Sequence, residues 1–108
     1  MALKKKGERL MNITKNREEN KLTVTVEGKI DSVTAPEFEE FIKENIDGVT
    51  VLTLDLSSLD YISSAGLRVL LLTQKRMNAQ GTMKVTNVNE TVSEIFEVTG
   101  FSDILTIG

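Results

Sequence analysis

The chain has 108 residues, of which 40% are hydrophobic and 27% charged, a composition typical of one folded domain. It has no cysteine and no histidine, which excludes disulfides, thiolate catalysis and the side chain that most often serves as general base or metal ligand. The net charge of −3 argues against a nucleic-acid partner, and no apolar run is long enough to span a bilayer. We therefore expect a cytoplasmic binding or signalling module without catalytic residues, metal or cofactor.

The first part of the chain predicts an extension followed by two strands. Residues 1–10 are basic and lack periodicity, so we expect a disordered extension of a domain that covers residues 11–108. Apolar and polar residues alternate around Ile13 and again over 21–27, which predicts two strands. The polar turn at 17–20 between them indicates a hairpin.

The middle of the chain predicts a helix, a strand and a second helix. A helix is expected over 35–46, because Thr34 can cap it, a proline follows in the first turn and apolar residues recur at helical spacing. The run 51–56 is almost entirely aliphatic and β-branched, which predicts a central strand covered on both faces. After a loop, a second helix is expected over 64–79.

The last part of the chain predicts a strand over 82–88, a helix over 90–99 and a final strand over 101–107. Lys75 and Arg76 are interpreted as the solvated end of the preceding helix. Strands that alternate with helices favour βαβ crossovers, so we predict a single α/β domain. Its central mixed sheet has four to five strands and packs with three to four helices. Four large apolar side chains are expected in the core: Phe41, Leu54, Leu70 and Phe96.

The most distinctive segment is LDLSSLDYISSAGLRVLL, residues 54–71, in which a helix begins around Ser63 and Ser64. Either hydroxyl can accept a hydrogen bond from the N–H groups exposed at a helix N-terminus. From spacing alone, a pure helix cap explains these serines as well as any functional role does. A phosphate at this position would be stabilised, because the N-terminus of a helix carries partial positive charge.

The same segment resembles the signature of the STAS domain family, whose type members are bacterial anti-sigma factor antagonists. The matching residues are Asp55, Leu56, Ser57, Ser63, Ser64, Ala65, Gly66 and Leu67. Residues 28–31 and 98–101 match two further motifs of the family in the same order, so the resemblance spans roughly residues 12–107. It implies the STAS fold, a mixed sheet of four to five strands packed with helices.

The resemblance also implies roles for individual residues. In the family, the serine two residues before the helix glycine is phosphorylated by a kinase that is also the anti-sigma factor, and that position is Ser64. The family often has aspartate immediately before this serine, where this chain has Ser63, so Ser63 is the alternative phospho-acceptor. The expected partner-binding residues are Asp31, Ser63, Ser64, Ala65 and Gly66. Asp31 could instead cap its own loop, and Gly66 is expected to allow close approach of the helix to the sheet.

The implied function is an anti-sigma factor antagonist in a partner-switching pathway. The unmodified domain would bind an anti-sigma factor/serine kinase, phosphorylation would abolish that binding, and a phosphatase would restore it. We expect a monomer. The alternative is a STAS scaffold or accessory subunit of a stress-sensing complex or a membrane transporter. A weak nucleotide-binding protein is a third class, but the chain has no glycine-rich phosphate loop.

Overall fold

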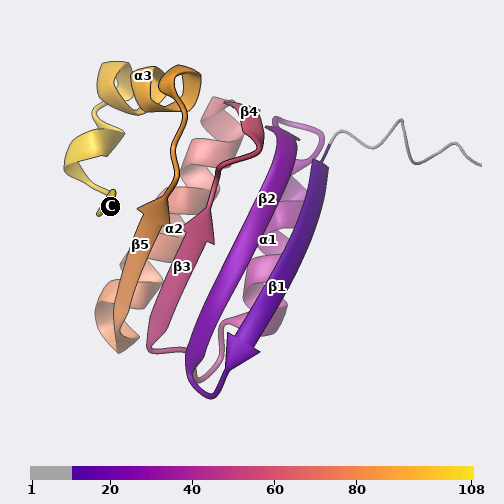
Figure 1. Cartoon of the computed structure of the whole chain (residues 1–108), viewed down its shortest axis with the longest axis vertical. Helices are drawn as coiled ribbons and strands as arrows, with labels where there is room; N and C mark the ends of the chain where they lie inside the picture. Colours follow the sequence, from indigo (N-terminus) through magenta and orange to yellow (C-terminus); the bar gives the residue numbers. More distant parts are fainter. Residues whose placement is uncertain (1–10) are drawn as a thin grey trace, which may run out of the picture.

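The structure, a computed structural model, describes residues 11–108, so the expected extension over 1–10 lies outside the described residues. Its frame is a five-stranded sheet in the order β1-β2-β3-β5, with β4 paired to β2 (Figure 1). The strands are β1 (Met11–Glu18), β2 (Lys21–Ile30), β3 (Val51–Asp55), β4 (Leu59–Ile62) and β5 (Thr82–Thr86). The helices are α1 (Ala35–Asn45), α2 (Ser64–Gln80), α3 (Glu90–Thr99) and the short 3-10 helix η3 (Phe101–Asp103). The predicted fold class is confirmed, since residues 11–108 form a single domain with a mixed sheet and three α-helices.

The sheet is mixed because it begins with a hairpin and continues with parallel strands. β1 and β2 are antiparallel, while β2 pairs in parallel with β3 and β3 with β5. β2 pairs with β3 over residues 21–25 and with β4 over residues 28–30. Gly28 lies where β2 passes from one neighbour to the other, with a positive φ of 92° that favours glycine. The long strand β2 thus carries both halves of the sheet.

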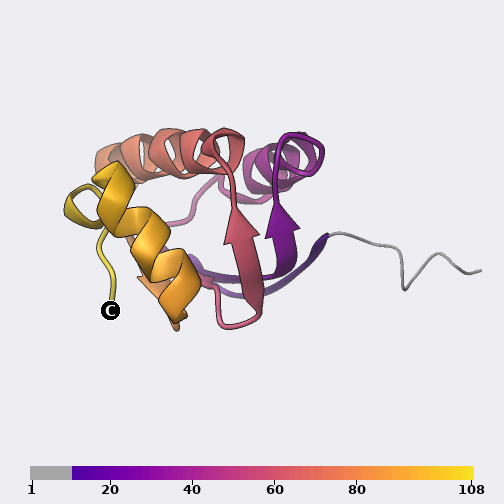
Figure 2. The same ribbon diagram turned by 90° about the horizontal axis from the view of Figure 1, so that it is seen from above.

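Both α1 and α2 cover the same face of the sheet, and no helix formed by residues 11–108 packs across the opposite face (Figures 1 and 2). On β3, Leu52 and Leu54 are fully buried, whereas Thr53 is only partly covered. The strand is interior, as predicted, since it lies between β2 and β5. The prediction that both of its faces are covered is wrong, because threonine and aspartate alternate with the leucines and face the open side.

Three of the four residues expected in the core are fully buried, and the fourth is not. Leu54, Leu70 and Phe96 are fully buried. Phe41 is only partly buried and packs against the edge of the core. On α1 the buried positions are Ala35, Phe38 and Ile42, so it is Phe38 that occupies the interior. The apolar stripe of α1 thus includes Phe38 and Ile42, while Phe41 lies at its edge.

Two segments form other elements than the sequence predicts. Residues 59–62 form β4 where a loop was expected, and residues 101–107 contain η3 where a strand was expected. One isolated bridge, between Val85 and Ile107, remains of that last strand. α2 ends at Gln80, one residue beyond the predicted end. Lys75 and Arg76 are exposed, as predicted, but they lie just before the last turn and not in it.

Candidate functional site

The loop after β2 and the start of α2 lie side by side at one end of the sheet. β2 and β4 are parallel and pair Ile30 with Ile62, so both strands end at the same edge. The backbone N–H of Ser63 donates to the carbonyl oxygen of Ile30 at 2.8 Å. Residues 28–31 and the serine segment, two matching motifs of the sequence analysis, are therefore neighbours in space. Figure 1 shows this edge at the upper ends of β2 and β4.

The two serines have different surroundings although they are adjacent in the chain. Ser64 is the first residue of α2 and is exposed. Ser63 is the residue before the helix, in an extended conformation, and its Oγ is buried without a hydrogen-bond partner among residues 11–108. Its side chain makes no capping hydrogen bond, so the cap interpretation does not describe Ser63. The hydroxyl that a partner can reach is that of Ser64.

Gly66 holds the start of α2 close to the sheet. A Cβ at this position would lie 2.6 Å from Cγ2 of Ile30 and 2.6 Å from Cγ1 of Ile62, far inside contact distance. Gly66 is buried, as this close approach requires, while Ala65 beside it is partly exposed. Its expected role in helix packing is therefore visible in the structure. Its expected contact with a partner would have to be made through the neighbouring residues.

Asp31 organises the loop between β2 and α1. Its Oδ1 accepts hydrogen bonds from the backbone N–H groups of Val33 at 2.9 Å and Thr34 at 3.1 Å. These two hydrogen bonds, that of Thr34 first, lower the pKa of the Asp31 carboxyl below its usual value. The hydroxyl of Thr34 accepts a hydrogen bond from the N–H of Asp31 and donates one to the carbonyl oxygen of Lys29. It does not cap α1, so the prediction that Thr34 caps this helix is wrong. The loop-capping role of Asp31 is thus present, and Asp31 directly follows Ile30, whose carbonyl accepts the hydrogen bond from Ser63.

A second ordered carboxylate, Asp55, lies at the end of β3. Its Oδ1 accepts from the N–H of Ser57 at 3.0 Å and from the side-chain amide of Asn87 at 3.2 Å. The first of these lowers the pKa of Asp55. Within residues 11–108, no group of three or more histidine, cysteine or acidic side chains could hold a metal ion. In the same part of the chain, no helix has the length and apolar character needed to cross a membrane.

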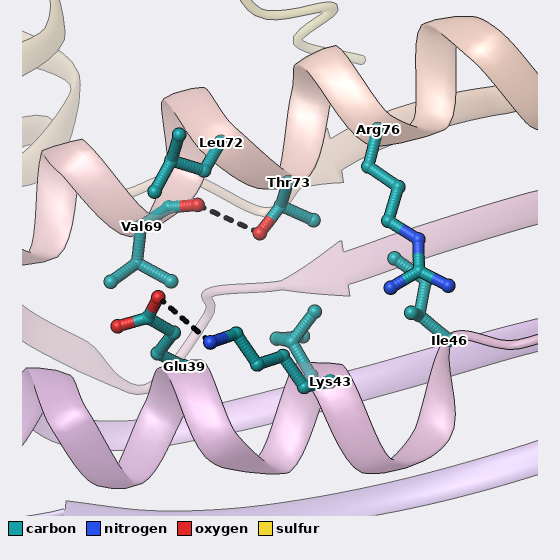
Figure 3. A pocket seen from close by; sticks show the side chains of 8 residues that line it. Glu39, Lys43, Ile46, Val69, Leu72, Thr73 and Arg76 are labelled. Atoms are coloured by element: carbon teal, nitrogen blue, oxygen red, sulfur yellow. Dashed lines mark hydrogen bonds and ion pairs between the residues drawn. The ribbon is translucent and has the colours of Figure 1, made fainter.

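A surface on α2 that begins at Ser64 was not among the predicted features. Leu72, two helical turns after Ser64, is 42% exposed, and Arg68 between them is also exposed. Beside Leu72 a pocket of about 120 Å³ opens between α1 and α2 (Figure 3). Its lining residues are Glu39, Ile42, Lys43, Ile46, Val69, Leu72, Thr73 and Arg76. The recurrence of Ser64, Arg68 and Leu72 at intervals of four residues is the signal that could have indicated it.

Comparison with known proteins identifies the fold and its relatives. A sequence profile of the STAS domain family matches residues 12–108. BtrV of Bordetella bronchiseptica, provisionally named an anti-sigma factor antagonist, is 35% identical over 99 residues, which are 90% of this chain and 85% of that protein. The anti-sigma-B factor antagonist of Bacillus subtilis is 31% identical over 98 residues, with 90% of each chain covered.

A solved structure gives the same picture of the fold. An anti-sigma factor antagonist from Mycobacterium paratuberculosis superposes with a TM-score of 0.82 at 24% identity, covering 90% of this chain and 84% of that one. The edge that carries Asp31 and Ser64 thus sits in a fold shared with anti-sigma factor antagonists. Since the family profile covers nearly all of the sequence, the chain belongs to the STAS domain family.

Proposed function

We propose that this domain is an anti-sigma factor antagonist. It binds an anti-sigma factor/serine kinase and dissociates from it when Ser64 is phosphorylated. The observation that carries the proposal is the exposure of Ser64 at the first position of α2, next to a serine whose hydroxyl is buried. The names of the relatives support the antagonist function. A structural neighbour, the Bacillus cell fate determinant SpoIIAA, has been solved in a phosphorylated form, which supports control by phosphate.

The position of Ser64 suits a phosphate that acts on the partner and leaves the fold unchanged. A phosphate adds a charge of roughly −1.5 to −2 at neutral pH and three strong acceptor oxygens. The free N–H groups at the start of α2 favour such a charge, so the helix itself is not disrupted. The carboxylate of Asp31 lies on the adjacent loop, so the phosphate would create a local concentration of negative charge. A partner fitted to the unmodified surface would then be repelled.

The test uses the anti-sigma factor/kinase from the same genome, ATP and four forms of the domain. Mass spectrometry of the wild type is expected to find one phosphate, on Ser64. Ser64→Ala is expected to stay unmodified and bound, while Ser64→Asp binds more weakly because it brings part of the phosphate charge. A loss of about 2–3 kcal/mol corresponds to roughly 30- to 150-fold weaker binding. Ser63→Ala is the matched control and is expected to be phosphorylated and released like the wild type.

Two results would contradict this function. A phosphate on Ser63 would show that the modified position is one residue earlier. Equal binding by Ser64→Ala and Ser64→Asp would favour a constitutive scaffold or accessory subunit over a switch. We infer that the domain acts as a monomer in the cytoplasm and that a phosphatase resets it, and sedimentation of the purified domain tests the monomer.

A further inference from the structure

The positive charge of the helical layer is concentrated on α2. This helix carries Arg68, Lys75 and Arg76 and has no acidic residue over its 17 positions. By contrast, α1 has four glutamates against one lysine, and α3 has three glutamates and no basic residue. The chain as a whole has a net charge of −3. A basic helix surface in an acidic domain is suited to a partner surface of opposite charge.

Two of these three cations are available to a partner. Arg76 forms an ion pair with Asp47 at 2.6 Å. Arg68 and Lys75 make no hydrogen bond or ion pair with other residues in the range 11–108, and both are exposed. Their positions follow Ser64 by four and eleven residues, which places all three on one side of the helix. We call this exposed row, Ser64, Arg68, Leu72 and Lys75, the α2 stripe.

The α2 stripe borders an apolar pocket. Leu72 belongs to the stripe and also lines the pocket between α1 and α2, whose apolar walls include Ile42 and Val69 (Figure 3). At the rim, Lys43 pairs with Glu39 at 3.5 Å, so these two charges offset each other. An apolar centre inside a charged rim is the usual arrangement of a protein–protein contact. The pocket volume of about 120 Å³ suits one aliphatic side chain and not a larger ligand.

We propose that the partner's docking surface extends from Ser64 along the α2 stripe to the pocket between α1 and α2. Its occupant is an acidic segment of the partner protein that inserts one aliphatic side chain beside Leu72. This inference rests on the proposed function, whose partner and switch it describes in more detail. It adds the C-terminal half of α2 to a contact that the serine motif places only at the start of the helix.

The same charges explain how a phosphate on Ser64 would act over the whole surface. Arg68 lies one turn further along α2, at an axial rise of about 6 Å, where residues four apart on a helix can form ion pairs. A phosphate of charge roughly −2 would pair with Arg68 and leave a net negative charge at the Ser64 end of the α2 stripe. The acidic segment would lose its attraction to the α2 stripe. Release therefore needs no movement of the pocket.

The test measures the dissociation constant of the purified anti-sigma factor/kinase from the same genome, by calorimetry, for matched variants. Leu72→Ala is expected to weaken binding about 30-fold, because a few side chains at the centre of an interface carry most of the binding energy. Its control is Val98→Ala on α3. Val98 is 78% exposed and lies on another helix. The double variant of Arg68→Gln and Lys75→Gln is expected to weaken binding about tenfold and to reduce its salt dependence, unlike the exposed Lys84→Gln on β5.

The outcomes separate this inference from the proposed function. If the wild type binds and all variants bind equally well, the docking surface proposed here is wrong while the antagonist function stands. If the wild type shows neither binding nor phosphorylation, both are wrong. Sedimentation of the domain alone tests a second copy as the occupant. If the wild-type domain forms a dimer and Leu72→Ala is a monomer, the proposal of an acidic partner segment is wrong and the surface serves self-association.

Discussion

Replacing Gly66 with alanine tests how closely α2 must approach the sheet. In an unobstructed helix this change stabilises by roughly 0.5–1 kcal/mol, because glycine loses more conformational freedom on folding. Here the new methyl group would lie 2.6 Å from Cγ2 of Ile30 and from Cγ1 of Ile62. Carbon atoms without bonds between them prefer about 3.5–4.0 Å, so α2 or both isoleucines must move by about 1 Å.

The two isoleucines have little room to yield. Ile30 is 0% and Ile62 1% exposed, and the atoms involved are attached directly to Cβ, so no flexible chain end can swing away. Overpacking in such a core costs about 1–3 kcal/mol, and two contacts this short place the cost near the upper end. After the gain in helix propensity we expect Gly66→Ala to lower the free energy of unfolding by about 2 kcal/mol.

Urea denaturation followed by circular dichroism measures this free energy. A loss of about 2 kcal/mol corresponds to a melting temperature lower by roughly 8 °C in a domain of this size. The double variant of Gly66→Ala and Ile62→Ala is expected to be more stable than the sum of the single effects, because the methyl group enters the space vacated by Ile62. The control Ala65→Gly, one position earlier, creates no steric clash and is expected to cost about 1 kcal/mol, chiefly from helix propensity. An unchanged or raised stability of Gly66→Ala would refute the close packing argued here.

Two further predictions concern the polar groups of the site. Ser63→Ala is expected to change the free energy of unfolding by about 1 kcal/mol or less, because the buried Oγ makes no hydrogen bond that its removal would break. A loss above about 2 kcal/mol in urea denaturation would show that the Oγ does make a stabilising hydrogen bond. The lowered pKa of Asp31 means that its charged form stabilises the fold above the ordinary aspartate pKa of about 3.9, and that this contribution is lost as the pH falls below it. Asp31→Asn is therefore expected to flatten the acid limb of a stability curve measured from neutral pH down to strongly acidic pH. Asp60→Asn, which removes an exposed carboxylate of β4, controls for net charge and should leave more of that limb intact.

The elements with regular periodicity could be predicted from the sequence, and the short ones could not. The alternation in β2 and the apolar spacing of α3 identify these elements without reference to the rest of the chain. β4 has only four residues, and it becomes a strand because it pairs with the end of β2, some 30 positions earlier in the sequence. Residues 101–107 have a strand-like composition, yet only Ile107 finds a neighbouring strand to pair with. Pairing partners of this kind are contacts between distant residues, which local patterns do not contain.

At the candidate site, the residue types alone determined that a helix begins after the strand and that its N-terminus can carry a phosphate. They also identified the motifs that surround it. The adjacent Ser63 and Ser64 have the same chemistry, so no pattern distinguishes them by accessibility. Only the tertiary structure separates them: Ser63 is held against Ile30 by its backbone hydrogen bond, and Ser64 begins α2 on the side that faces solvent. The neighbouring position of Asp31 and the pocket beside Leu72 likewise exist because parallel strands and packed helices bring together segments far apart in sequence. Local sequence determines each element, but which atoms reach the surface depends on what packs against it.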